Sequence, residues 1–169
     1  MRSAFLPDVE HVYEIIRSYA VNGTLLPRTM AELCENVRDF KVVERGGKVI
    51  GCGALHLYGM HLAEIRSIAV IPDGKGLGAG RKLVEGLLAE AGRHQVTCVC
   101  LFTRIPEFFA RMGFDIATRE ELPDKIYKDC LHCPKLYACD EIAMYRGEIP
   151  HQRGRRNIQI PIPLVRLEA

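Results

Sequence analysis

The sequence lacks an excess of charge of either sign. Its 169 residues include 23 Lys and Arg against 21 Asp and Glu, which leaves a formal net charge of +2. A surface so nearly balanced has no general attraction for nucleic acid or for an anionic membrane. We therefore expect neither partner, and any anion that the protein binds must be held by a local arrangement of groups.

Long apolar runs are also missing. No stretch approaches the roughly 20 residues needed to cross a bilayer, and the first residues, MRSAFLPD, reach charge at once instead of forming the apolar part of a signal peptide. We therefore expect a cytoplasmic protein. Because the chain has 169 residues, 48% of them hydrophobic, it is predicted to bury one core in a single domain.

The seven cysteines lack the even count of a disulfide framework. Three of them lie in apolar, strand-like runs, where a free thiol behaves as a small hydrophobic group: Cys52, Cys98 and Cys100. Three others suggest a zinc site, because they are closely spaced and have His132 nearby: Cys130, Cys133 and Cys139. A tetrahedral site needs a second close pair of ligands, so we favour a packed turn and predict no metal. A redox pair is the weaker alternative, because the cytosol keeps thiols reduced.

Hydrophobic periodicity predicts a mixed α+β order of elements. Helical spacing begins after Asp8, a candidate N-cap, and stops at Asn22-Gly23, while a capping box of Thr29 and Glu32 starts a second helix. The pattern then changes to strands, with Gly46-Gly47 as the turn of a hairpin. Later elements are predicted at residues 48–58 (strand), 62–71 (strand), 83–91 (helix), 96–102 (strand), 106–112 (helix) and 140–145 (strand).

A glycine-rich segment, residues 75–81 (KGLGAGR), lies between a predicted strand and a predicted helix. Glycines at that place let backbone N–H groups converge on an anion at the positive end of the helix dipole, where a pyrophosphate would fit. Two other phosphate-binding motifs do not match. The segment lacks the Gly-Lys-Ser/Thr ending of a P-loop, and it follows an antiparallel run of strands, whereas a Rossmann fingerprint follows an opening parallel strand.

Residues 69–84, AVIPDGKGLGAGRKLV, resemble the acetyl-CoA motif of the GNAT superfamily of N-acetyltransferases, with Lys75 where that motif has Gln or Arg. Residues 108–114, FFARMGF, resemble a later segment of the same superfamily. The resemblance implies the GNAT fold, an α+β domain in which helices flank a mixed, mostly antiparallel central sheet.

The resemblance covers roughly residues 4–146, so we expect the acetyltransferase domain at residues 1–146. The remainder, residues 147–169, contains Arg153, Arg155 and Arg156 followed by an Ile-Pro-Ile-Pro stretch, and is expected to form a basic, extended arm.

Within the superfamily, the sequence is most similar to the short, stand-alone N-acetylglutamate synthase-like enzymes. Three stretches carry this narrower resemblance: residues 25–29 (LLPRT), residues 62–70 (LAEIRSIAV) and the cysteine-bearing residues 128–144. Many superfamily members have, at the position of Phe109, a Tyr that protonates the leaving thiolate. Members of this narrower group commonly have Phe there, so Phe109 is a mark of the group.

The resemblance implies acetyl-CoA as the cosubstrate. Backbone groups of Ile68, Ala69 and Val70 would bind the pantetheine arm and polarise the acetyl carbonyl, because the strand there diverges from its neighbour. The other residues assigned to acetyl-CoA are Lys75, Gly76, Leu77, Gly78, Ala79, Gly80, Arg81 and Phe109.

Glu64 is the candidate catalytic base. It alternates with Ile65 along a predicted strand, so it can face the cleft and take a proton from the acceptor's ammonium, directly or through water. An equal alternative is an exposed strand carboxylate paired with Arg66.

An α-amino dicarboxylic acid carries two carboxylates, which bidentate arginines recognise. Arg28, in the turn between the first two helices, and Arg104, which follows Thr103 at the end of a core strand, resemble glutamate-contacting positions of the synthases. Arg66 is a third candidate. For each arginine the alternative is a solvated surface residue.

The sequence thus predicts an enzyme that acetylates the α-amino group of a small-molecule amino acid, foremost L-glutamate, in the reaction that opens arginine biosynthesis. Acetylation of a peptide N-terminus, a protein lysine or a polyamine is the alternative within catalysis. A non-catalytic acyl-CoA-binding module is the alternative outside it. A homodimer is left open.

Overall fold

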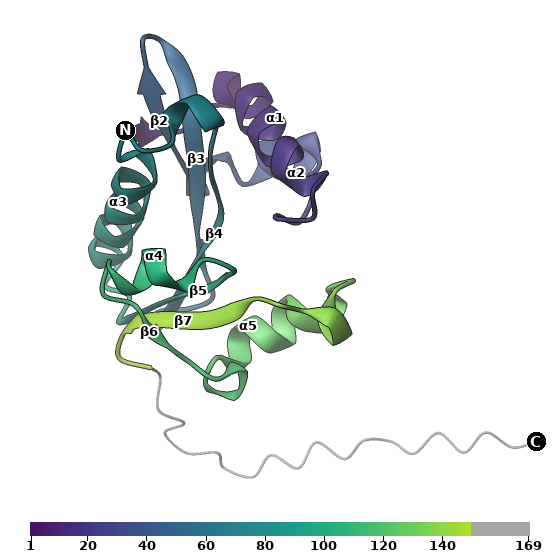
Figure 1. Ribbon diagram of the computed structural model, residues 1–169. Coiled ribbons are helices and arrows are strands. Elements are labelled where there is room, and N and C mark those ends of the chain that lie inside the picture. Colours follow the sequence, from purple (N-terminus) through teal and green to yellow (C-terminus); the bar gives the residue numbers. More distant parts are fainter. Residues whose placement is uncertain (150–169) are drawn as a thin grey trace, which may run out of the picture.

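A seven-stranded sheet with helices on both faces is formed by residues 1–149, which are the residues that the computed structural model describes (Figure 1). The strand order is β1-β2-β3-β4-β5-β7-β6, and every neighbouring pair is antiparallel except β4 and β5. The predicted mixed, mostly antiparallel α+β sheet is confirmed. Of the predicted basic arm, the part from residue 150 onward, with Arg153, Arg155 and Arg156, lies outside the described residues.

The helices and strands follow the chain in an order close to the predicted one. They are β1 (Arg2–Ser3), α1 (Val9–Ala20), α2 (Met30–Glu35), β2 (Phe40–Arg45), β3 (Lys48–Leu57), β4 (Leu62–Val70), α3 (Ala79–Arg93), β5 (Cys98–Thr103), α4 (Pro106–Ala110), β6 (Asp115–Ile116), α5 (Pro123–Lys128) and β7 (Ile142–Gly147). The sequence patterns missed β1, β6 and α5, because each is too short to show a period.

The first two helices begin and end largely as the sequence predicts. Gly23, with a φ of +68°, follows α1, and the Thr29 hydroxyl accepts a hydrogen bond from the Glu32 amide at the start of α2. Asp8 occupies the predicted N-cap position of α1, but its side chain makes no capping hydrogen bond to that helix. Its carboxylate instead accepts two bonds from the Arg2 guanidinium, at 2.6 and 2.7 Å, and one from the Phe5 amide. The strong bidentate pair with Arg2 fixes the carboxylate away from the α1 amides.

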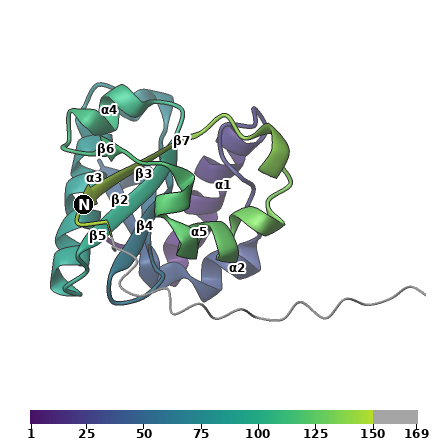
Figure 2. The ribbon, with the colours of Figure 1, turned by 90° about the horizontal axis from the view of Figure 1, so that it is seen from below.

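Each face of the sheet has its own apolar layer. On one face α3 packs over β2, β3 and β4, and on the other face α1 packs over β3 and β4, while α5 lies beneath β7 at the far end (Figures 1 and 2). The predicted core thiols are confirmed, since Cys52, Cys98 and Cys100 are fully buried. Burial raises the pKa of Cys52 to about 12 and that of Cys98 to about 11, so both thiols stay protonated at neutral pH.

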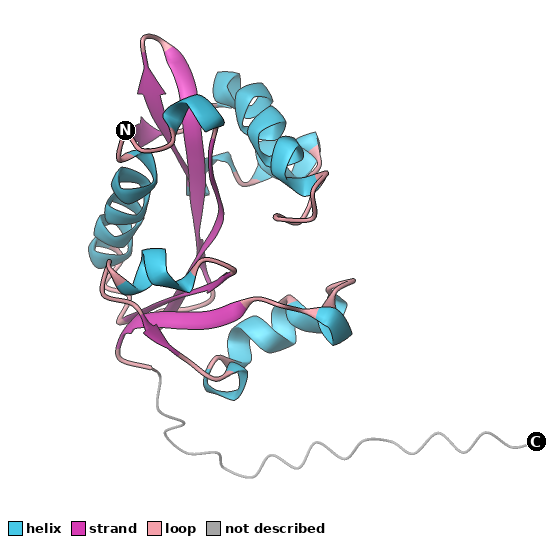
Figure 3. Ribbon diagram, in the orientation of Figure 1, coloured by secondary structure: helices cyan, strands magenta, loops and turns pink. Residues whose placement is uncertain are grey.

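The two parallel strands part soon after they meet. β4 pairs with β5 only from Leu62 to Glu64, and the two strands then diverge, as Figure 3 shows between the upper and lower parts of the sheet. A bulge lies farther along β4, where the register with β3 shifts and Ser67 has a φ of +52°. Bulges bend a strand and redirect its side chains. Within the described residues, the stretch from 65 to 70 thus has no strand beside it where β5 would continue.

Among residues 1–149, no helix combines the length and apolar composition that crossing a membrane requires. The longest described helix, α3, has 15 residues, and its apolar side chains face the sheet.

We predict that Leu87→Ala will destabilise the protein by about 2–5 kcal/mol, because this fully buried side chain joins α3 to the sheet and its removal leaves a cavity. Urea unfolding will measure the change in free energy. Val21→Ala is the matched control, since Val21 is 80% exposed and should cost less than about 0.5 kcal/mol. Equal losses in the two variants would contradict the packing described.

Candidate functional site

A cleft of about 670 Å³ opens where β4 leaves β5. Most of the residues predicted to hold acetyl-CoA line it: Ile68, Ala69, Val70, Lys75, Gly76, Gly78, Ala79, Gly80, Arg81 and Phe109. Leu77 differs, because it is 46% exposed and is not one of the lining residues. Sequence reasoning missed Tyr19, Thr24, Leu25, Gly74, Ile105 and Phe108, which complete the lining.

The glycine-rich loop forms one end of this cleft. Gly76 and Gly78 both have a φ of +75°, a conformation that favours glycine, and Gly78 directly precedes α3. The first amides of a helix have no partner within the helix, so those of Ala79, Gly80 and Arg81 are available to an anion. Lys75 and Arg81 add positive charge. The loop therefore fits a pyrophosphate.

The aromatic residues beside the cleft are fixed by packing. Phe109 is 2% exposed and packs edge-to-face against Phe108 and Phe114. The Tyr19 hydroxyl donates a hydrogen bond to the Val70 carbonyl oxygen at 2.5 Å, which holds α1 to the end of β4. The phenyl ring of Phe109 has no proton to donate.

A second cavity, of about 110 Å³, adjoins the cleft at Leu25, which lines both. It contains three of the predicted site residues, Glu64, Arg66 and Arg28. The rest of its charged lining was not predicted: Arg119, Lys125, Asp129 and Glu141. Lys125 lies on α5 and Asp129 directly follows that helix, four residues later, so the two side chains lie on one side and meet at 3.0 Å. The sequence shows their spacing, but the packing of α5 under β7 decides where they point.

Glu64 is buried at 3% exposure and is held by three hydrogen-bond contacts. Lys125 Nζ lies 2.9 Å from Glu64 Oε1 and 3.1 Å from Oε2, and the Tyr58 hydroxyl lies 2.7 Å from Oε2. The alternative of an exposed carboxylate paired with Arg66 is therefore wrong, because Arg66 instead lies 3.7 Å from Asp129. The second lone pair of Glu64 Oε1 remains able to accept a bond from a group in the cavity.

Three groups surround Glu64, and the pKa of each is shifted: Lys125, Tyr58 and Asp129. Burial opposes the charge on Lys125, but Glu64 and Asp129 outweigh burial and raise the pKa of the ammonium. Burial and the charge of Glu64 raise the pKa of Tyr58, so its hydroxyl stays protonated. For Asp129, burial is outweighed by the hydroxyl of Tyr58 and by Lys125, and the carboxyl pKa falls. Glu64 thus sits beside a permanent cation at neutral pH.

Arg104 and Thr103 lie outside the second cavity. Arg104 forms a bidentate pair with Asp140, at 2.8 and 2.7 Å, and donates to the Thr24 carbonyl oxygen at 2.8 Å. The buried Thr103 hydroxyl accepts from the Ile105 amide. In this structure both residues fasten the end of β5 to its surroundings, and neither reaches the groups around Glu64.

Three free cysteines, Cys130, Cys133 and Cys139, line the second cavity. Burial raises the pKa of the Cys130 thiol, which makes it a poor nucleophile at neutral pH. Within residues 1–149, no group of three His, Cys, Asp or Glu side chains is arranged to hold a metal ion.

Comparisons with known proteins agree with this geometry. Residues 9–114 match the model of the Acetyltransferase (GNAT) family. The chain is 42% identical over 146 residues to an uncharacterized N-acetyltransferase of Chlorobaculum tepidum, covering 86% of this chain and 94% of that one. It is 40% identical over 117 residues to an amino-acid acetyltransferase of Mycobacterium tuberculosis, covering 68% of this chain and 67% of the relative.

Solved structures give the same picture. A Mycobacterium tuberculosis protein in complex with CoA and NLQ superimposes with a TM-score of 0.74 at 32% identity, over 87% of this chain and 98% of that chain. The N-acetylglutamate synthase of Neisseria gonorrhoeae, complexed with coenzyme A and N-acetyl-glutamate, gives a TM-score of 0.79 at 26% identity, over 86% of this chain and 34% of that chain. The chain therefore belongs to the acetyltransferase (GNAT) family, whose cosubstrate is acetyl-CoA.

Proposed function

We propose that this protein transfers the acetyl group of acetyl-CoA to the α-amino group of an amino acid, foremost L-glutamate, the step that opens arginine biosynthesis. The observation that carries the proposal is the second cavity, which adjoins the cofactor cleft. The buried carboxylate of Glu64 and four cationic side chains line this cavity; the cations are Arg28, Arg66, Arg119 and Lys125. Cations suit the carboxylates of an amino acid, and a buried carboxylate suits its ammonium.

Relatives support the same acceptor class. Several are named amino-acid acetyltransferases, and one structural neighbour holds N-acetyl-glutamate. The chain spans about a third of the length of that synthase and 28% of the Ralstonia nicotianae relative, so the acceptor of those longer proteins supports a proposal here and no more.

Residues of the cleft and of the second cavity take different parts in acetyl transfer. The amides that precede and begin α3 bind the pyrophosphate. Ile68–Val70, where β4 no longer pairs with β5, offers amides to the pantetheine arm and the thioester carbonyl. Glu64, at the point where β4 and β5 part, accepts the proton of the acceptor's ammonium. Lys125 orients the Glu64 carboxylate through its contacts with both oxygens. Since Phe109 cannot donate a proton, the thiolate leaves without an acid at that position.

A polycationic acceptor is the less favoured alternative. A polyamine or a lysine-rich peptide needs an acidic pocket, whereas the second cavity has four cations against the three carboxylates of Glu64, Asp129 and Glu141. A non-catalytic acyl-CoA-binding module would bind CoA without turnover.

A screen of acceptors tests the proposal directly. Release of free CoA thiol from acetyl-CoA should be fastest with L-glutamate among the common amino acids, and slower with polyamines and lysine peptides. Turnover with polyamines only, or tight CoA binding without turnover of any acceptor, would refute the amino-acid proposal.

The glycine-rich loop, as the proposed pyrophosphate site, leads to a second prediction. Gly78→Asp should weaken CoA binding at least about 10-fold, because a carboxylate at the start of α3 opposes the pyrophosphate. Gly78→Asn is the matched control, since Asn also tolerates positive φ and carries no charge. Among residues 1–149, no atom lies within 4 Å of the position that a Cβ would take there, so both variants have room. Calorimetric titration with CoA will compare them, and equal affinities would remove the loop from the anion site.

The proposed role of Glu64 as the catalytic base leads to a third prediction. Glu64→Gln should lower kcat by about 10²–10⁴-fold while the KM for acetyl-CoA stays within about two-fold, because proton removal matters in the transition state and the cofactor contacts are elsewhere. Lys125 keeps Asp129 as its partner in this variant, at 3.0 Å, which limits the structural loss. Steady-state kinetics between pH 6 and 9 will test it. An unchanged pH–rate profile would exclude Glu64 as the base.

A further inference from the structure

The charged side chains of the second cavity differ in how far they are already neutralised. Lys125 touches two carboxylates, those of Glu64 and Asp129. Arg66 shares Asp129 with it, at 3.7 Å. Arg28 faces the Glu32 carboxylate at 3.8 Å from the turn between α1 and α2. These three cations have acidic partners before any acceptor arrives.

Arg119 is different. Its Nη2 donates long hydrogen bonds to the carbonyl oxygens of Cys139 and Glu141, at 3.4 and 3.5 Å, and within residues 1–149 it forms no ion pair. A guanidinium has five N–H donors, and the bonds to the two carbonyl groups use only those of Nη2. The Nε and Nη1 donors are left for a partner, and each can give a charge-assisted hydrogen bond to a carboxylate oxygen.

The acidic residues near Arg119 are held elsewhere. Arg119 begins a 3₁₀ turn, Arg119–Glu121, which is fixed by a capping box. In this box the Glu121 carboxylate accepts bonds from the amide and hydroxyl of Thr118, at 2.7 and 3.1 Å. The Glu141 carboxylate lies toward Arg104, at 4.0 Å. Leu122, which is fully buried, anchors the turn, so the direction of Arg119 is set by the fold.

We propose that Arg119 determines acceptor specificity by receiving a carboxylate of the acceptor, in the place that the sequence assigned to Arg104. Arg104 is already paired with Asp140. Arg119, in contrast, lines the cavity that contains Glu64 and forms no ion pair among the described residues. This inference rests on the proposed function, since it concerns how the same cavity selects an amino-acid acceptor. Arg28, whose partner Glu32 lies at 3.8 Å and is half-buried, can contribute a second cation from across the cavity.

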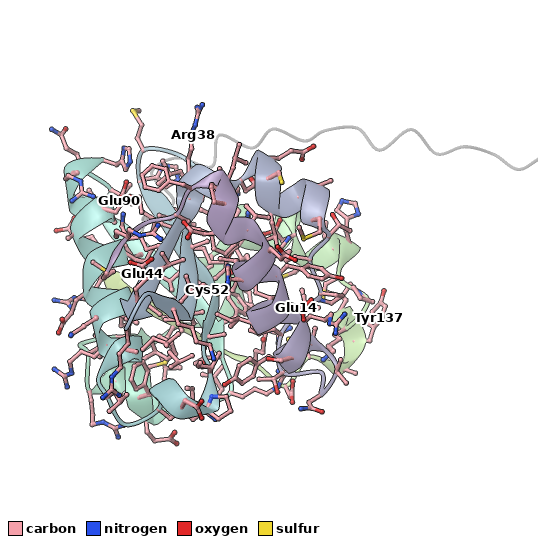
Figure 4. All side chains as sticks on the ribbon, turned by 90° about the horizontal axis from the view of Figure 1, so that it is seen from above. Glu14, Arg38, Glu44, Cys52, Glu90 and Tyr137 are labelled. Carbon is pink, nitrogen blue, oxygen red and sulfur yellow. The ribbon has the colours of Figure 1, made fainter. Side chains whose placement is uncertain are left out.

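The experiment compares Arg119→Ala and Arg119→Lys with wild type, using L-glutamate as the probe. Arg119→Ala should raise the KM for glutamate about 30-fold or more, while the KM for acetyl-CoA stays within about two-fold. Arg119→Lys keeps the charge but loses the fixed, planar array of N–H donors, and should lie between the two. Arg38→Ala is the matched control. Arg38 is exposed and points into solvent away from the sheet (Figure 4), so its removal should change neither constant.

Binding of CoA in its own cleft reports whether each variant is folded, because Arg119 lines only the second cavity. In a variant that binds CoA normally, an unchanged KM for glutamate would overturn the role of Arg119 and leave the proposed function intact. An equal loss in Arg38→Ala would also overturn it. If the wild type acetylates no amino acid, the proposed function fails, and the role of Arg119 fails with it.

Discussion

The divergence of β4 from β5 is the constraint on which both cavities depend. The two strands share only three pairs, from Leu62 to Glu64, before they separate. The bulge at Ser67 then divides what β4 offers. Residues 64–67 line the second cavity and residues 68–70 line the cofactor cleft. One strand therefore lines both cavities in turn, and under the proposed function it would present groups to the acetyl donor and to the acceptor.

Burying the Glu64 carboxylate where β4 and β5 part requires partner charges, because a buried charge without partners is costly. The cationic partner, Lys125, comes from α5, a helix that adds little to the apolar core, and Asp129 directly follows that helix. The segment after α5 is tied back to the turn that follows α1. Lys135 Nζ donates to the Gly23 carbonyl oxygen at 2.7 Å, and Arg104 donates to that of Thr24. The first bond ties the segment after α5 to the turn after α1, and the second ties the end of β5 to the same turn. Both satisfy carbonyl groups beyond the end of α1.

Local patterns made much of the fold predictable. Gly46-Gly47, Thr29 with Glu32 and the glycine-rich loop act over a few residues, and each appears where the sequence puts it. The acceptor side was harder. Arg104 follows a core strand, as the sequence predicts, but its guanidinium is paired with Asp140, which lies 36 residues away in the sequence. The surroundings of Glu64 were likewise hidden, because Lys125 is 61 residues distant and lies on a helix with no visible period. Pairings of that range depend on packing, which a single sequence does not reveal.

The family model covers residues 9–114, and every residue that lines the cofactor cleft falls within it. Half of the lining of the second cavity comes from beyond residue 114, between Arg119 and Glu141. Within residues 1–149, the segment beyond residue 114 contributes to the second cavity and not to the cofactor cleft. A substitution in that segment can therefore reshape the second cavity while every residue that lines the cofactor cleft stays the same.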